Sequence, residues 1–162
     1  MCVLKTLTPE LRGAFRAMLH KSWVETYTKE LGTEAAMALV ASLSSDDLAG
    51  LTPNKDEKVL IAYCGDTLVG STVFAARNGV TYVWGCYVLE KFQRRGLGRR
   101  LLLKSIDPDE PNNTVQITVL KSSAGAIKFY ECLGFQTISE NPFKLLPELT
   151  VPSITMIRKP SG

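Results

Sequence analysis

The first third of the chain has a hydrophobic pattern that predicts one short strand followed by two helices. Residues 2–7 alternate and are rich in β-prone types, so they predict a strand. Thr8-Pro9-Glu10 is a typical helix start, and apolar residues recur at helical spacing from Leu11 to Leu19. A second helix is expected from about Thr33 to Leu43, with its apolar residues on one face.

The middle of the chain has the period of two that is typical of strands. Lys58–Cys64 is apolar and β-branched, and the tight-turn pair Gly65-Asp66 joins it to a second strand, Leu68–Ala76. Asn78-Gly79 is a strong hairpin signal, and a third strand is expected over Val80–Leu89. These three segments predict an antiparallel meander.

The last part of the chain alternates between helical and strand patterns. The apolar period changes to 3.6 over Leu97–Ile106, and the proline-rich, acidic stretch Asp107–Asn113 breaks the pattern. The remaining elements are a strand over Thr114–Leu120, a helix over Ala124–Leu133 capped by Gly134, and strands over Phe135–Ser139 and Thr150–Arg158. The order β-α-α-β-β-β-α-β-α-β-β predicts one α+β domain over residues 1–162, with a mixed, mostly antiparallel sheet and helices on both faces.

Composition narrows the classes of function. The 162 residues carry a net charge of +3, with 45% hydrophobic and 22% charged residues, which is ordinary for a globular domain. The basic residues gather around one loop and helix start, which favours a local anionic ligand over a nucleic acid. No apolar run is long enough to cross a membrane, and the N-terminus lacks a signal-peptide pattern, so a membrane partner is not expected.

The cysteines and the histidine argue against a disulfide framework and a metal site. The four cysteines are Cys2, Cys64, Cys86 and Cys132, and none has a CxxC neighbour. We expect them to be reduced thiols in a cytoplasmic protein. His20 is the single histidine of the chain, so a histidine-rich metal site is not expected either.

Residues 93–98, with the sequence Gln-Arg-Arg-Gly-Leu-Gly, join a predicted strand to a predicted helix. Glycines in such a loop let the backbone approach a ligand, and the helix start supplies unpaired N–H groups and a positive dipole end. Together these features predict a phosphate site, to which the arginines add charge. The Walker pattern and the dinucleotide-binding pattern are both absent.

Two motifs in order resemble the GNAT N-acetyltransferase superfamily. The stretch from Val88 to Leu102 resembles its motif A, Q/R-x-x-G-x-G/A, and the stretch from Ser123 to Phe135 resembles its motif B, N-x-x-A-x-x-x-Y-E-x-x-G-F. The resemblance is strongest from Val80 to Phe135, and the order of elements extends it to the whole chain. It implies a single GNAT-like domain that uses acetyl-CoA as co-substrate and no metal.

The resemblance also implies where the coenzyme binds. The backbone of one strand would pair with the pantetheine arm, the loop and helix start would hold the pyrophosphate, and the strands Tyr82–Leu89 and Thr114–Leu120 would splay apart around the thioester. Ser123 stands where the family usually has Asn. The implied coenzyme-binding residues are Cys86, Tyr87, Val88, Gln93, Arg94, Arg95, Gly96, Leu97, Gly98, Arg99, Ser123 and Tyr130.

Acyl transfer to an amine needs a neutral amine, a stabilised oxyanion and a proton for the leaving thiolate. Tyr130 stands at the family's general-acid position. The alternative is that Tyr130 is simply an amphipathic core residue of the helix. The oxyanion would meet a backbone N–H near Val88. The family's usual base positions carry Tyr82 and Thr118 here instead of Glu, so we expect a water-mediated base helped by one of them.

Other candidates stay open beside that reading. Glu25 or His20 could reach the site from the N-terminal helices, or the acceptor could arrive neutral. The segment over residues 22–27 is expected to follow the first helix, and the family resemblance implies that this region lines the acceptor side. Trp23 and Tyr27 could wall the acceptor side or belong to the core. Cys86 is expected to be a small buried hydrophobe, since a covalent route would need His20 as its partner.

The sequence therefore predicts an acetyl-CoA-dependent N-acetyltransferase that acts on a small-molecule or peptide amine, as a monomer or a homodimer. One alternative is a GNAT-like module that binds acyl-CoA without catalysis. Another is an unrelated phosphate-binding domain, which motif B argues against.

Overall fold

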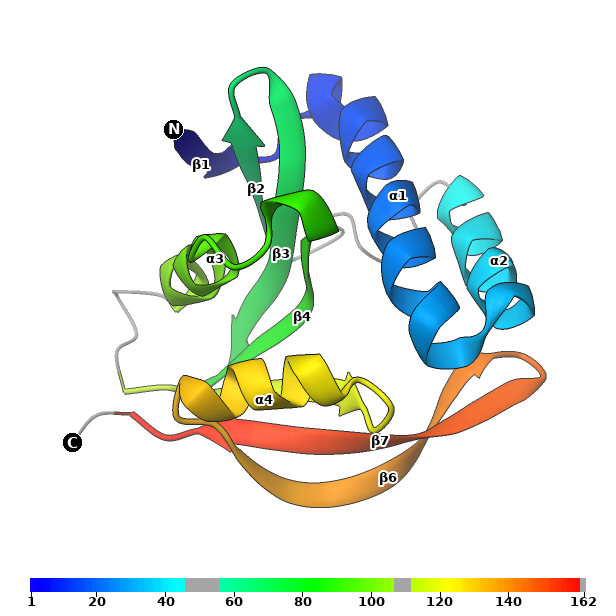
Figure 1. Ribbon diagram of the computed structural model, residues 1–162. Helices are drawn as coiled ribbons and strands as arrows, with labels where there is room; N and C mark the ends of the chain where they lie inside the picture. The colour runs from blue at the N-terminus through cyan, green and yellow to red at the C-terminus, as the bar shows by residue number, and fades with distance from the viewer. Residues whose placement is uncertain (46–55, 107–111, 161–162) are drawn as a thin grey trace.

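A seven-stranded sheet in the order β1-β2-β3-β4-β5-β7-β6 organises the chain (Figure 1). The structure, a computed structural model, describes residues 1–45, 56–106 and 112–160. All neighbouring strands are antiparallel except β4 and β5, which run parallel. The strands are β1 Cys2–Thr6, β2 Lys58–Cys64, β3 Thr67–Arg77, β4 Val80–Val88, β5 Thr114–Leu120, β6 Gln136–Leu146 and β7 Leu149–Arg158.

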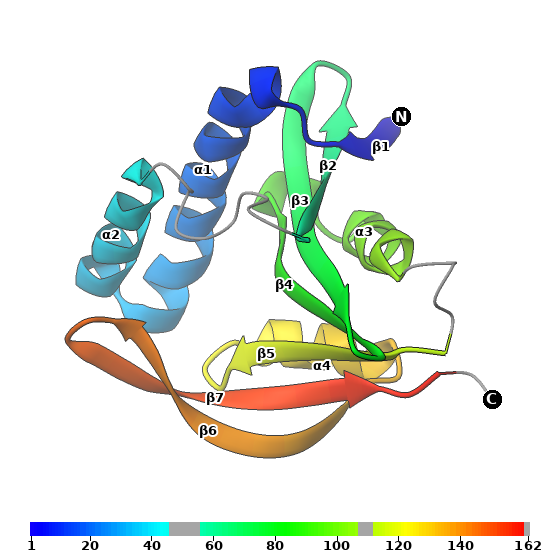
Figure 2. The ribbon, with the colours of Figure 1, turned by 180° about the vertical axis from the view of Figure 1, so that it is seen from behind.

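Helices cover both faces of this sheet, as the sequence predicts. α3 and α4 lie over the strands on the face turned to the viewer in Figure 1, and α1 and α2 form a pair beside β3 and β4 (Figures 1 and 2). Apolar residues of α1, α2 and α3 form one hydrophobic cluster with β2 and β3, and α4 forms a second with β5 and β7. The helices are α1 Arg12–Leu31, α2 Thr33–Ala41, α3 Leu97–Ser105 and α4 Ala124–Cys132, with 3-10 turns η1 Pro9–Leu11, η2 Ser42–Ser44 and η3 Glu90–Phe92.

β4 and β5 are paired only at one end. Val80–Val83 pair with Thr114–Ile117, and beyond these residues the two strands separate. β4 also bulges against β3, where the register shifts between Ser71 and Val73, and Gly85 takes a positive φ of 72°. Glycine adopts that backbone without steric cost, so the bulge bends β4 away from β5. The predicted splay of these two strands is therefore confirmed.

Most predicted elements are confirmed, and several boundaries are not. β2 and β5 have the predicted bounds, and the turn residues Asn78 and Gly79 both take positive φ, at 51° and 81°. The prediction that residues 22–27 follow the first helix is wrong, because α1 continues to Leu31 and stops at Gly32, whose φ is 90°. Of the predicted break over residues 107–113, the first five lie outside the described residues.

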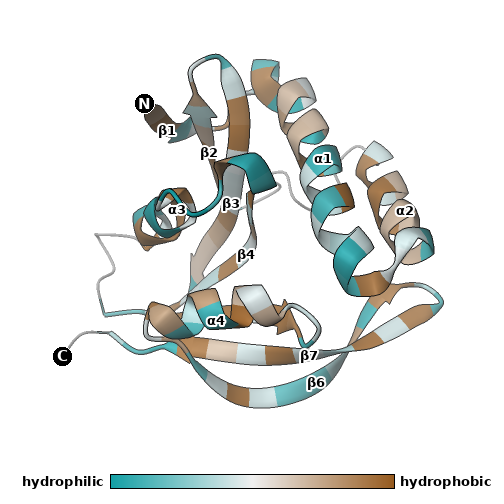
Figure 3. Cartoon of the chain, in the orientation of Figure 1, coloured by the Kyte–Doolittle hydropathy of each residue, from teal (hydrophilic) through white to brown (hydrophobic). Residues whose placement is uncertain are grey.

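The strand after α4 is longer than predicted. β6 extends to Leu146 instead of ending at Ser139, and it pairs with β7 along most of its length. The residues of its first nine positions are exposed, and Figure 3 shows a polar stretch in the middle of this strand. Because neither face of β6 is buried there, its sequence lacks the alternation that marks a half-buried strand.

The prediction that all cysteines are reduced thiols is wrong in this structure. Cys2 and Cys64 form a disulfide across β1 and β2, with their Cα atoms 4.1 Å apart. The two residues are direct partners in the antiparallel register, although 62 positions separate them in sequence. Cys86 and Cys132 are free.

Candidate active site

The loop at residues 93–98 ends in a left-handed glycine that begins α3. Gly96 has φ 77° and ψ 8° and is the N-cap of the helix. The first helical hydrogen bond runs from the Arg100 N–H to the Gly96 carbonyl at 3.0 Å. The N–H groups of Leu97, Gly98 and Arg99 therefore precede the helical ladder, and such groups suit an anion at a helix start.

The two glycines of the loop have different physical roles. A Cβ on Gly96 would meet nothing within 4 Å, so its positive φ is what requires glycine. A Cβ on Gly98 would lie 3.4 Å from Cζ of Phe129 and 3.8 Å from Cγ2 of Val88. Gly98 thus lets α3 approach both α4 and β4 closely, which holds the loop against the splayed strands.

Some polar side chains of the loop contact the rest of the protein, and others are exposed arginines. Gln93 donates from Nε2 to the carbonyl of Val88 at 2.8 Å, which ties the loop to the end of β4. Arg95 lies over the Phe92 ring at 5.5 Å, while Arg94 and Arg99 are exposed. The exposed guanidinium groups provide the positive charge that a pyrophosphate needs.

Cys86, Tyr87 and Val88 form the part of β4 that no longer pairs with β5. The side chain of Tyr87 points toward α1, where its hydroxyl lies 3.0 Å from that of Tyr27 and its ring 5.9 Å from the ring of Trp23. Trp23 is only 6% exposed and belongs to the core, whereas Tyr27 is half-buried. Of the two predicted wall residues, therefore, only Tyr27 stays partly accessible.

Tyr130 lies in α4 and is packed against other aromatic rings. Its ring makes edge contacts with Phe129 at 5.2 Å and Phe135 at 5.5 Å between centroids. Burial raises the pKa of the Tyr130 phenol well above its ordinary value of 10, with further contributions from Cys86 and Tyr27. The phenol is therefore protonated at neutral pH, and it lies next to the unpaired part of β4.

Cys86 is a neutral thiol beside Tyr130. Burial raises the pKa of the Cys86 thiol to about 12, which outweighs the opposing effect of its polar neighbours. A nucleophilic cysteine must be deprotonated to the thiolate, usually by an adjacent base such as histidine. His20 is exposed on α1, so the structure agrees with a small buried side chain at Cys86.

The predicted helpers of the base lie apart from Tyr130. Tyr82 is half-buried on β4 opposite Gln116, where β4 and β5 are still paired, and Thr118 is exposed on β5 opposite Thr155. In the described part of the chain, neither makes a hydrogen bond with Tyr130. Glu25 accepts a hydrogen bond from the Glu90 backbone N–H at 3.0 Å, so it ties α1 to η3.

One carboxylate that the sequence analysis missed lies close to this cluster. Glu30 is half-buried in the last turn of α1, and Ser123 donates a hydrogen bond from Oγ to its Oε2 at 2.6 Å. Burial raises the pKa of the Glu30 carboxyl, and the Ser123 bond opposes that shift. Tyr27, three residues earlier on the same helix, is electrostatically coupled to it. The spacing of three residues between Tyr27 and Glu30, which places both side chains on one face of a helix, is the only feature of the sequence that could have indicated Glu30.

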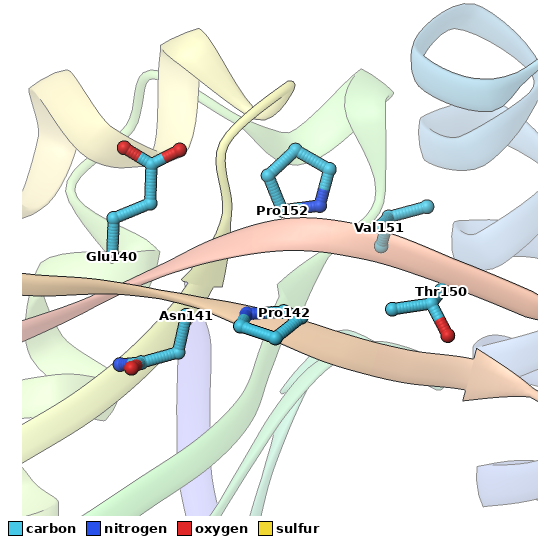
Figure 4. A pocket seen from close by; sticks show the side chains of 6 residues that line it. All are labelled: Glu140, Asn141, Pro142, Thr150, Val151 and Pro152. Carbon is cyan, nitrogen blue, oxygen red and sulfur yellow. The ribbon is translucent and has the colours of Figure 1, made fainter.

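Two surface hollows lie away from these residues. One, of about 550 Å³, is lined by residues of β6 and β7 that include Pro142 and Pro152 (Figure 4). The other is lined by residues of β1 and α3, among them Arg100, which donates to the Cys2 carbonyl at 3.2 Å. Neither contains the motif residues Gly96 or Tyr130.

Comparison with known proteins identifies the same region. The model of the Acetyltransferase (GNAT) family matches residues 16–135. A comparison with curated protein sequences finds no match. The fold is similar to that of the PaiA N-acetyltransferase of Thermoplasma acidophilum, solved with coenzyme A, at 17% identity and a TM-score of 0.79, covering 98% of this chain and 99% of that one.

Two further solved structures share the fold over nearly their whole length. The ribosomal-protein-S18-alanine N-acetyltransferase of Escherichia coli is 17% identical with a TM-score of 0.69, covering 100% of this chain and 96% of that one. A GNAT acetyltransferase of Staphylococcus aureus is 14% identical with a TM-score of 0.73, covering 99% and 100%. None of the described helices could span a membrane. The described residues also contain no group of three or more metal-ligating side chains.

Proposed function

The chain belongs to the acetyltransferase (GNAT) family, and on that premise we propose that it is an acetyl-CoA-dependent N-acetyltransferase acting on a primary amine. The observation that carries this proposal is the position of Tyr130. A protonated, buried phenol lies beside the part of β4 that separates from β5 and is continuous with the loop at residues 93–98.

The residues present fit coenzyme A. The helix start with its exposed arginines suits the pyrophosphate, because N–H groups and guanidinium groups both bind phosphate oxygens. The backbone of residues 86–88 has lost its pairing with β5, so it is available to an extended pantetheine arm. Ser123, which replaces the family's usual Asn, keeps a hydroxyl at the start of α4 but gives it to Glu30.

In the proposed reaction the amine nitrogen attacks the acyl carbon, and the C–S bond then breaks. A backbone N–H near Val88 stabilises the oxyanion. Tyr130 donates a hydrogen bond to the leaving sulfur and supplies its proton. Because the pKa of the free phenol exceeds the value near 8.5 of an ordinary thiol, full transfer requires a stabilised phenolate.

We propose that a bound water, assisted from β4 or β5, takes the proton from the attacking amine. Tyr82 and Thr118 remain the proposed helpers of such a water. Both flank the place where the two strands part, since Tyr82 pairs with Gln116 and Thr118 follows the last paired residue. The proposed acceptor is a small molecule or a peptide, and the proposed setting is the cytoplasm.

Calorimetry with acetyl-CoA, followed by a thiol-release assay over a panel of amines, tests this proposal. The panel should contain n-butylamine, spermidine and a peptide with a free N-terminus. Binding of acetyl-CoA with amine-dependent thiol release is the expected result. Absence of acetyl-CoA binding would refute the proposal outright.

A second candidate function is acyl-CoA binding without catalysis. The observation that favours it is the absence of a carboxylate at Tyr82 and Thr118, where related enzymes place their base. Tight acetyl-CoA binding with no thiol release on any amine of the panel would support this candidate over the first.

A further inference from the structure

Glu30 is a carboxylate held between two helices rather than exposed on one. It lies in the last turn of α1, and its Oε2 accepts a hydrogen bond of 2.6 Å from Ser123, the residue that precedes α4. Its neighbour Lys29 pairs with Glu90 at 3.0 Å instead, so that cation does not neutralise it. The groups that face Glu30 are Tyr27 from its own helix and Ser123 from α4.

Ser123 has an unusual role for its position. It is the N-cap of α4, where a serine hydroxyl commonly accepts a hydrogen bond from the first turn. Here the side chain makes no capping bond, and the hydroxyl donates to Glu30 instead. The Ser123 side chain therefore orients the Glu30 carboxylate and does not cap α4.

The same carboxylate is connected to the Tyr130 phenol. Ser123 precedes Tyr130 by seven residues of α4, which is about 10 Å along a helix axis. Tyr27 is close enough to influence both ends, since the Glu30 charge raises the pKa of Tyr27 and Tyr27 in turn raises the pKa of Tyr130. Glu30, which could hold the amine acceptor, is thus bound at one end of this span, and Tyr130, beside the leaving sulfur, lies at the other.

We propose that Glu30 is the acceptor-binding carboxylate of this enzyme, which binds a primary amine in its cationic form and takes up, through the bound water, the proton that the nitrogen loses after attack. This inference rests on the proposed acetyl transfer. It concerns the amine side of the site, where Ser123 of motif B orients the carboxylate.

The proton and bond changes balance with Glu30 in this role. The bound ammonium first gives one proton to solvent, which leaves a neutral amine. Its nitrogen then forms a bond to the acyl carbon and becomes acidic, and its second proton passes through the bound water to the Glu30 carboxylate. The C–S bond breaks, and the sulfur takes the Tyr130 proton. The proton on Glu30 then passes to solvent, and Tyr130 regains its proton from solvent, so the products are the amide and the free thiol.

Glu30→Gln separates this role from a structural one. The amide oxygen of Gln still accepts the bond from Ser123, so the contact between α1 and α4 is kept while the charge is lost. The matched control is Glu34→Gln, which makes the same change at an exposed position in the first turn of α2. A second variant, Ser123→Ala, keeps the charge and removes the orienting bond.

The experiment measures acetyl-CoA affinity by calorimetry, and kcat/KM for the best amine of the panel from pH 5.5 to 9. We expect Glu30→Gln to bind acetyl-CoA within twofold of the parent and to lose about 10²-fold or more in kcat/KM, the usual size of a general-base effect. The acidic limb of its pH profile should disappear, and Glu34→Gln should match the parent. A Glu30→Gln enzyme within threefold of the parent, with the same pH profile, would overturn the inference.

A binding arm distinguishes failure of this inference from failure of the proposed enzyme. Spermidine and n-butylamine are titrated into the protein saturated with coenzyme A, for the parent and for Glu30→Gln. Amine binding that weakens at least tenfold in the variant supports the site even if no acetyl transfer is found. Equal binding to both proteins, or binding to neither, would overturn it.

Discussion

Replacing Tyr130 with phenylalanine removes one hydroxyl and leaves the packing of α4 intact. The edge contacts with Phe129 and Phe135 involve the ring, and a phenylalanine ring preserves them. The variant loses the hydrogen bond between the Tyr130 hydroxyl and the Cys86 thiol, which is worth about 1 kcal/mol. For a domain of this size that corresponds to about 2–4 °C in melting temperature. The effect on catalysis should be far larger, about 10²–10⁴-fold for a general acid.

The assay compares thiol release, acetyl-CoA affinity and melting temperature for the parent, Tyr130→Phe and Tyr130→Ala. Tyr130→Phe should lose at least 10²-fold in kcat, while acetyl-CoA affinity hardly changes and the melting temperature falls by only about 2–4 °C. Tyr130→Ala should also lose about 3–5 kcal/mol of stability, because it empties a site that is 8% exposed. If Tyr130→Phe keeps kcat within tenfold, or loses affinity and turnover equally, the phenol is not the acid.

Three further predictions concern the loop, the disulfide and Glu30. Gly96→Ala should lower stability by about 1–2 kcal/mol, since an L-residue is strained at φ 77°, and should weaken acetyl-CoA binding. Gly13→Ala in α1, where a Cβ also meets nothing within 4 Å, is the matched control in calorimetry and melting experiments. Reduction of Cys2–Cys64 by dithiothreitol should lower the free energy of unfolding by about 2–4 kcal/mol, as measured in urea. Equal urea midpoints with and without reductant would show that the bond is not formed in solution. Because the pKa of Glu30 is raised in the folded protein, the stability that its protonation contributes is present below the unfolded pKa and lost as pH rises through the folded one. Glu30→Gln should therefore have a higher urea midpoint than the parent at pH 7, and the difference should vanish near pH 4.

Local patterns were sufficient to predict the elements with a buried face. β2 and β5 contain β-branched residues on a half-buried surface, and their bounds match the structure. The Asn78-Gly79 turn was found because its residue types suit positive φ. β6 was predicted too short because its exposed polar centre is stabilised by pairing with β7 rather than by burial of one face.

The coenzyme side of the site could be predicted because its residues are adjacent in sequence. The loop at residues 93–98 is local, and its glycines follow from backbone geometry and close packing. Glu30 and the Cys2–Cys64 pair depend instead on contacts across 93 and 62 positions. The residue pattern of a single helix or strand does not indicate these contacts, because they form only when elements distant in sequence pack together in the fold.

The short ladder between β4 and β5 also bears on how the molecule opens. Within the described residues it is the one strand pairing that joins β1–β4 to β5–β7, and it spans four residues on each strand. The second hydrophobic cluster crosses this ladder, since it contains Phe74, Val83 and Leu102 beside residues of β5 and β7. The two units, β1–β4 and β5–β7, are therefore held together by packing as well as by strand pairing. Parallel pairing between distant segments forms late in folding, because a long loop must close first. A ligand lying in the gap between the strands would contact both units, and it would bind most tightly to the state in which they are docked.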